Sequence, residues 1–198
     1  MNYPWRSNPR IALVVVGLGT ALACGLESRA ADKPGSPSEQ FLALTQEYQT
    51  AQAEFSKLYR EAKTDADREK LRSEKMPDAK KFAPRIWELA EKNAKDSAAL
   101  EALVWLTTNA YQTEEAAKAL GSLARGHAAS EKVAAVCGMA PYISPSAAGE
   151  FLRAVMEKNP KREIQARACQ SLYVYSLMAE PSQADKYLNL LGKNFAKL

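Results

Sequence analysis

One short pattern of apolar residues occurs four times along this 198-residue chain, and each copy ends at an anchor residue. The anchors are Asn93, His127, Asn159 and Asn194, and successive anchors are 34, 32 and 35 residues apart. A period of about 33 residues is typical of a repeated helix pair, which cannot bury its apolar face alone and must stack on its neighbours. The pattern therefore predicts an all-α fold of stacked helix pairs.

The matching positions of the four copies define the faces that we expect to be buried. Apolar residues stand seven, four and three positions before each anchor, the spacing of an inner helical stripe: Ile86, Leu89, Ala90, Leu120, Leu123, Ala124, Leu152, Val155, Met156, Tyr187, Leu190 and Leu191. A second helix is expected seven to thirteen positions after each of the first three anchors, with these apolar residues: Leu100, Leu103, Leu106, Ala134, Cys137, Ala140, Ala166, Cys169 and Leu172. The fourth copy has no such second helix before Leu198. Residues 77–198 are thus predicted to form a right-handed, TPR- or HEAT-like α-solenoid of about 3.5 units.

Residues 39–76 are predicted to form a helical hairpin that precedes the repeats. Its first helix follows Ser38 as N-cap and carries apolar residues at alternating spacings of three and four: Phe41, Leu44, Tyr48, Ala51, Phe55, Leu58 and Ala62. Thr64 caps a short charged helix, which ends before Pro77. We expect the hairpin to cover the first repeat, because the ends of a solenoid need a cap. The alternative is a free amphipathic arm that binds a partner or a membrane surface.

Proline and capping residues predict the remaining helix boundaries. Helices are expected over 80–93, 97–111 and from Thr113, where two glutamates favour the helix start. Further helices are expected over 130–141, from Ser144 with Pro145 at its first position, over 160–180 and after Pro181.

The first thirty residues resemble an export signal. Arg6 and Arg10 precede an apolar run over 11–23, which is short for a membrane-spanning helix of about 20 residues. Small residues at Ser28 and Ala30 predict cleavage after Ala30, followed by a flexible spacer over 31–38. A loose lipobox that would lipidate Cys24 is the alternative. We therefore expect an exported protein of the periplasm or cell envelope, with membrane attachment only through a lipid at Cys24.

Charge gives little indication of a nucleic-acid partner. The whole chain carries a net charge of +4, and residues 1–30 contain three arginines and one glutamate, so their removal leaves about +2. The basic clusters are short and no basic stripe is interleaved with aromatic residues, which disfavours nucleic-acid binding.

Cys137 and Cys169 occupy equivalent positions in adjacent units, ten residues after their anchors. Stacked helices lie about 8–10 Å apart, whereas a disulfide needs Cα atoms within about 7 Å. We predict two buried free thiols.

No pattern in the sequence indicates catalysis, a cofactor or a metal. His127 is the one histidine of the chain, so zinc sites with two or three histidines are excluded, and its position at an anchor favours a structural role. The sequence has no Gly-x-Ser-x-Gly, no Cys-x-x-Cys and, outside residues 1–30, no glycine-rich phosphate loop. Glu101, on an otherwise apolar helix, is expected to pair with a cation. An enzyme with an unrecognised pair of carboxylates remains an open alternative.

Aromatic residues provide the candidate binding surface. Core packing explains most of them, but Trp87, Trp105 and Tyr175 are candidates for a concave interface with a protein partner, because aromatic residues anchor interfaces.

Several short segments resemble the N-terminal helical region of exported bacterial thioredoxin-like proteins, the redoxins or thiol-disulfide oxidoreductases. The similar segments lie within residues 40–195 and include 61–65, 81–85, 99–105 and 159–163. The resemblance implies redox chemistry in a following thioredoxin domain, which is absent from this sequence, so no catalytic residue is carried over.

Two functions are therefore expected as alternatives. The first is an exported, non-catalytic helical-repeat domain for protein interaction or positioning. The second is the detached lead segment of a thiol-disulfide oxidoreductase.

Overall fold

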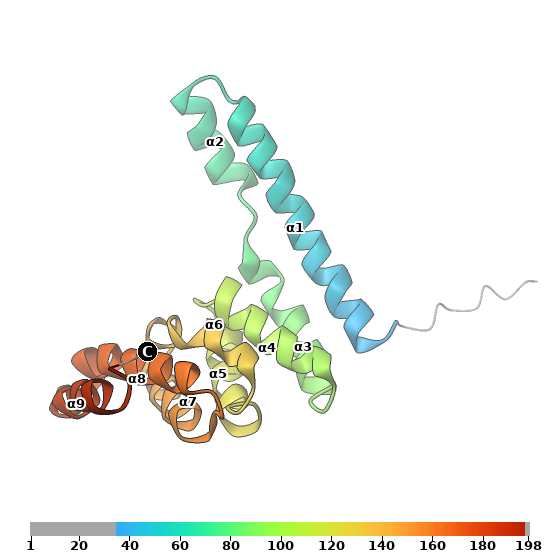
Figure 1. Cartoon of the computed structure of the whole chain (residues 1–198). Helices are drawn as coiled ribbons and strands as arrows, with labels where there is room; N and C mark the ends of the chain where they lie inside the picture. Colours follow the sequence, from blue (N-terminus) through green and yellow to red (C-terminus); the bar gives the residue numbers. More distant parts are fainter. Residues whose placement is uncertain (1–34, 197–198) are drawn as a thin grey trace, which may run out of the picture. The chain divides into compact units, whose positions relative to one another are not determined.

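The computed structural model describes residues 35–196, which belong to one compact unit, and every regular element in that range is helical (Figure 1). The α-helices are α1 (Pro37–Glu61), α2 (Asp65–Lys75), α3 (Ala83–Lys92), α4 (Ser97–Asn109), α5 (Glu114–Gly126), α6 (Ala134–Cys137), α7 (Pro145–Lys158), α8 (Arg162–Ala179) and α9 (Ala184–Asn194). Short 3-10 helices are η1 (Ala79–Lys81), η2 (Glu131–Val133), η3 (Ala140–Tyr142) and η4 (Pro181–Gln183). The all-α prediction is confirmed. The predicted export signal lies outside the described residues.

The helices from α3 onward stack in neighbouring pairs. α3 packs on α4 and α7 packs on α8, while the first helices of successive units, α3, α5 and α7, contact one another in order. The second helices α4, α6 and α8 form a parallel series of contacts, and α9 packs on α8. This arrangement is the predicted helical stack.

The predicted inner stripe forms the core of the stack. Ile86, Leu120, Leu152 and Tyr187 occupy the same place in the four units, and each is almost completely buried. Leu89, Leu123 and Val155, four positions before their anchors, are buried as well. In the fourth unit Leu190 and Leu191 stay partly exposed, because no partner helix follows α9 within the described residues.

The first three anchors end helices α3, α5 and α7. The backbone N–H groups of Asn93, His127 and Asn159 donate to the carbonyl oxygens of the residues four positions earlier, at 3.2, 2.9 and 3.0 Å. Asn93 and Asn159 also donate through their side-chain amides. The His127 imidazole forms no hydrogen bond with any described residue, so His127 ends its helix through its backbone alone.

The second helix of the second unit is shorter than predicted. In place of one helix over 130–141, η2 leads into the four-residue α6, and η3 follows after a turn. Gly138 has a low helix propensity and Pro141 has no N–H to donate, so a regular helix does not continue. Lys132 of this segment pairs with Glu101 of α4, the cation partner expected for that carboxylate.

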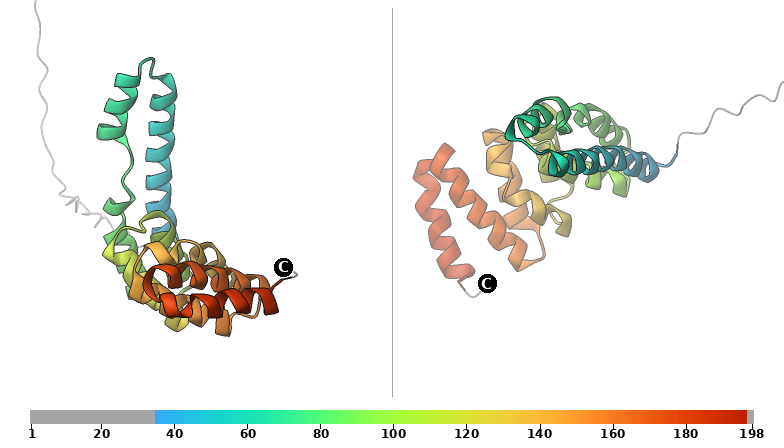
Figure 2. Two further views of the ribbon diagram at one scale, coloured as in Figure 1. Left: turned by 90° about the vertical axis from the view of Figure 1, so that its left-hand side faces the viewer. Right: turned by 90° about the horizontal axis from the view of Figure 1, so that it is seen from above.

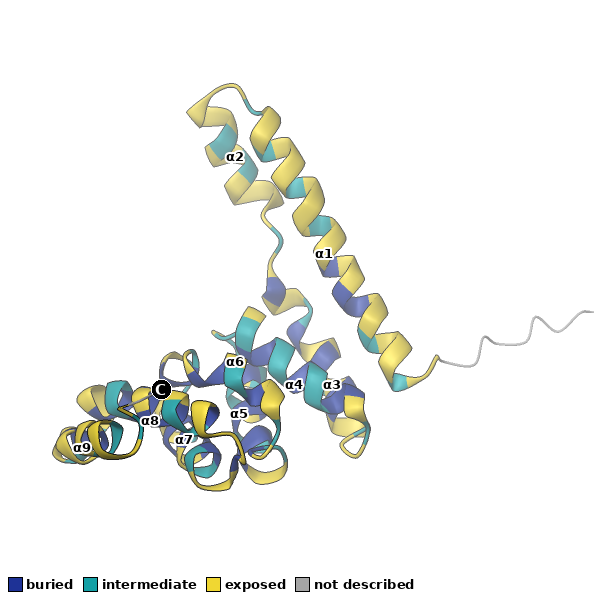
Figure 3. Cartoon of the chain, viewed as in Figure 1, coloured by how far each residue is buried: buried dark blue, intermediate teal, exposed yellow. Residues whose placement is uncertain are grey.

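The N-terminal hairpin covers the first repeat only in part. α1 begins at Pro37 rather than after Ser38, because Ser36 and Glu39 form a capping box. Its buried residues, Leu44, Thr45 and Tyr48, all lie in the N-terminal half, which packs on α3 and α4. The C-terminal half of α1 and all of α2 extend away from the stack and are mostly exposed (Figures 2 and 3). The predicted cap is therefore limited to the first half of α1.

Candidate functional site

The three aromatic residues proposed from the sequence do not form one surface. Tyr175 of α8 is only 5% exposed, and its hydroxyl donates to Glu180 at 3.1 Å. Trp105 of α4 packs edge-on against Tyr48 of α1, with 5.4 Å between ring centroids. Trp87 of α3 is half-buried and lines a groove. Tyr175 and Trp105 thus hold the fold together, and Trp87 alone remains a candidate for binding.

Trp87 lies in a groove of about 430 Å³ beside α3 and α5, which we call the α3–α5 groove. Its apolar surface comes from α3, α4 and the turn between them, and includes the buried residues Ala90, Ala99 and Leu103. The C-terminal end of α5 supplies Ser122, Arg125, Gly126 and the anchor His127. The groove therefore depends on the contact between two successive repeat units.

Two opposite charges line the α3–α5 groove without pairing. Glu91 and Arg125 are both exposed, and neither forms an ion pair with another described residue. Arg125 extends over Gly121, where a Cβ would lie 3.2 Å from the Arg125 Nη1. Desolvation lowers the pKa of His127 below its ordinary value of 6.5, so the imidazole is neutral near pH 7. At neutral pH the groove therefore has one negative charge, one positive charge and the Trp87 ring on an apolar surface.

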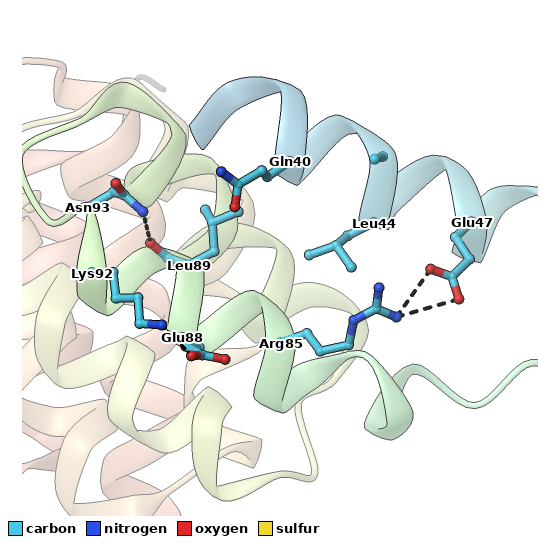
Figure 4. A pocket seen from close by; sticks show the side chains of 9 residues that line it. Gln40, Leu44, Glu47, Arg85, Glu88, Leu89, Lys92 and Asn93 are labelled. Atoms are coloured by element: carbon cyan, nitrogen blue, oxygen red, sulfur yellow. Dashed lines mark hydrogen bonds and ion pairs between the residues drawn. The ribbon is translucent and has the colours of Figure 1, made fainter. Parts of the chain in front are cut away.

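A second groove, of about 470 Å³, lies between α1 and α3 (Figure 4). Its charged residues pair with one another: Arg85 binds Glu47 at 3.1 Å, and Lys92 binds Glu88. The hydrogen bond from Lys92, with its charge, lowers the pKa of Glu88. These charges neutralise one another, and the Arg85–Glu47 pair joins α3 to α1.

The two cysteine thiols among the described residues are unreactive. Cys137 and Cys169 are buried and unbridged, as predicted, and their thiols donate to the carbonyl oxygens of Val133 at 3.4 Å and Tyr187 at 3.6 Å. Burial raises the pKa of Cys137 to about 12 and also raises that of Cys169. Both thiols stay protonated at neutral pH and make poor nucleophiles.

Within residues 35–196, no group of three or more His, Cys, Asp or Glu side chains is placed to hold a metal ion. In the same part of the chain, none of the helices is long and apolar enough to span a membrane. Cys24, the alternative lipidation site, lies outside the described residues.

The sequence indicated Trp87 as a candidate for binding and His127 as a structural anchor, but it did not indicate that Glu91, Leu103 and Arg125 lie beside them in one groove. These residues come from three different helices. The one signal in the sequence was the equivalence of the anchors, which places the ends of α3 and α5 side by side.

Comparison with family models, with curated proteins and with solved structures returned no match for this chain.

Proposed function

We propose that this chain is an exported, non-catalytic helical-repeat domain that binds a partner protein, and that the α3–α5 groove receives a peptide segment of that partner. The observation that carries the proposal is the groove itself, where the half-buried Trp87 lies beside Glu91 and Arg125, which have no ion-pair partner among the described residues. Concave sites with an apolar lining and a few polar groups are the usual place for ligand binding.

The α1–α3 groove gives a useful contrast. Its four charges are satisfied by each other, so a ligand would have to break Arg85–Glu47 or Lys92–Glu88 before it gained a new pair. In the α3–α5 groove a peptide gains contacts with Glu91 and Arg125 without such a loss. A half-buried tryptophan adds apolar contact area at a low cost in side-chain entropy.

The test is a selection from a random-peptide display library on the purified protein, followed by fluorescence anisotropy with the enriched peptides. We expect peptides with an apolar side chain beside an acidic one, and at least tenfold weaker binding to the Trp87→Ala and Arg125→Glu variants. Arg85→Glu, in the α1–α3 groove, is the matched control and should leave binding unchanged. Failure to enrich any peptide, or equal binding by all variants, would contradict the proposal.

The alternative function is the detached lead segment of a thiol-disulfide oxidoreductase. The burial of Cys137 and Cys169, whose thiols stay protonated, is compatible with this alternative, because the alternative assigns the redox chemistry to another domain. DNA immediately downstream of the Leu198 codon that encodes a thioredoxin-like Cys-x-x-Cys would favour this alternative, and unrelated DNA would oppose it.

A further inference from the structure

The C-terminal half of α1 and the whole of α2, residues 51–75, form an arm with very little core of its own (Figure 3). α2 has 11 residues, and none of them is buried. Helices shorter than about 12–15 residues are marginal in water, and most helical stability in proteins comes from packing an apolar face. The arm therefore lacks the burial that usually stabilises such a helix.

One face of the arm satisfies its own charges. Arg68 pairs with Asp65 at 2.9 Å, and Arg72 pairs with Glu69 at 2.8 Å. The Arg72 guanidinium also lies 5.3 Å from the centre of the Tyr59 ring. The charges of these residues are therefore already paired within the arm.

The other face, which we call the hollow face, has an apolar centre and unpaired charges. A shallow hollow of about 340 Å³ is lined by Leu58, Ala62 and Leu71, and Leu58 is 42% exposed. Charged residues surround this centre, namely Glu61, Asp67, Lys70, Glu74 and Lys75. None of these five forms an ion pair with another described residue.

The order of charges along the hollow face is self-complementary. Asp67, Leu71 and Lys75 are spaced by four residues, so they follow one another on the same side of α2. Reversing the direction of the helix exchanges the acid for the base and leaves leucine at the centre. In a two-fold symmetric contact the same patch occurs on both copies, so a patch of this kind matches itself when the two helices run antiparallel.

We propose that the hollow face of the arm binds the same face of a second copy of this chain. The two copies of Leu71 meet on the two-fold axis, with Leu58 beside them, and each Asp67 lies opposite Lys75 of the second copy. This inference does not depend on peptide binding in the α3–α5 groove.

Two observations favour a second copy over other occupants. The hollow face has both signs of charge in near balance, whereas a membrane surface or a nucleic acid would be matched by a face of one sign. Asp67 and Lys75 also lie about 12 Å apart along the helix axis, from the rise of 1.5 Å per residue, and so do not pair within one chain.

The experiment is a charge swap read out by sedimentation equilibrium on the purified protein. At roughly 100 µM, a concentration suited to a small interface of micromolar affinity, we expect the wild type at twice the chain mass. The Asp67→Lys variant places two lysines opposite each other, and the Lys75→Asp variant places two aspartates opposite each other. Each variant alone should therefore fall to the chain mass.

An equimolar mixture of the two variants restores every opposite-charge pair and should return to twice the chain mass. Asp65→Lys is the matched control, because Asp65 is also an acidic residue of the first turn of α2 but lies on the satisfied face, and this variant should remain dimeric. Far-UV circular dichroism checks that each variant stays helical. A monomeric wild type, singly substituted proteins that remain dimeric, or a mixture that stays monomeric would each overturn the proposal.

Discussion

Replacing Asn159 by alanine should destabilise the stack far more than the same change at Asn93, although the sequence makes the two residues equivalent anchors. The Asn159 side chain is 1% exposed and lies between two repeat units. Its amide group donates to the carbonyl oxygens of Ala128 at 2.9 Å and of Ser130 at 3.0 Å. Its oxygen accepts a hydrogen bond from the backbone N–H of Lys161 at 3.1 Å. Asn159 thus joins the end of α7 both to the loop after α5 and to the start of α8.

The expected loss of stability follows from the backbone groups that lose their hydrogen bonds when Asn159 is replaced by alanine. The Ala128 residue is 4% exposed, so its carbonyl loses a hydrogen bond that water replaces poorly, whereas Ser130 is only half-buried. A buried polar group left without a partner costs about 1–3 kcal/mol, so we expect Asn159→Ala to lower the free energy of unfolding by about 2–4 kcal/mol. Asn93 makes one side-chain hydrogen bond, to Leu89 of its own helix at 2.8 Å, and is half-buried. Asn93→Ala should cost about 0.5–1.5 kcal/mol.

The assay is urea unfolding followed by far-UV circular dichroism, with wild type and both variants measured in parallel. We expect a larger fall in the midpoint for Asn159→Ala with an unchanged slope, since the surface exposed on unfolding is the same. Asn159→Asp keeps the size of the side chain but turns an acceptor toward two carbonyl oxygens, so it should be at least as destabilising as alanine. Equal losses at the two anchors would refute the reasoning, because they would show that the contact between units contributes nothing.

Three further predictions follow from burial. In the native protein at about pH 8, Cys137 and Cys169 should resist alkylation and react only after denaturation, as mass spectrometry would show, because burial raises the pKa of both thiols. Gly149→Ala should destabilise the fold by about 1–3 kcal/mol in thermal unfolding, even though alanine favours helices, because its Cβ would lie 2.7 Å from Nη2 of Arg153 and 2.9 Å from the hydroxyl of the buried Tyr175. A stabilised variant would show that these two side chains move aside freely. The pKa of His127 is lower in the folded protein than in the unfolded chain, so its contribution to stability is present above pH 6.5 and is lost as the pH falls through the folded pKa. The His127→Asn variant should therefore retain its stability over that pH range. Identical pH profiles of the unfolding midpoint for the wild type and this variant would contradict the assignment.

The fold was predictable because burial and capping both leave local patterns. The repeated apolar stripe before Asn93, His127 and Asn159 correctly identified the core, and Thr113 caps α5 as its position indicated. The errors occurred where the local signal was weak. Ser36 and Ser38 are both acceptable N-caps, and the structure uses Ser36 because Glu39 completes its capping box.

The candidate groove was less predictable, because its residues become neighbours only through the stacking of units. Trp87 and Arg125 are separated by a whole repeat, and nothing near either residue in the sequence indicates that they line one cavity. The buried position of Tyr175 also could not be read from the sequence, since aromatic residues serve both cores and interfaces.

The sequence alone determined that this chain forms stacked helix pairs, because apolar residues that recur at helical spacing can leave water only by packing against an equivalent neighbour. It also determined that Cys137 and Cys169 stay apart, since equivalent positions on stacked helices are separated by the thickness of a helix. Only the tertiary structure decided which anchor joins two units and which half of α1 covers the stack. These properties depend on distances between residues far apart in the chain, which local spacing does not specify.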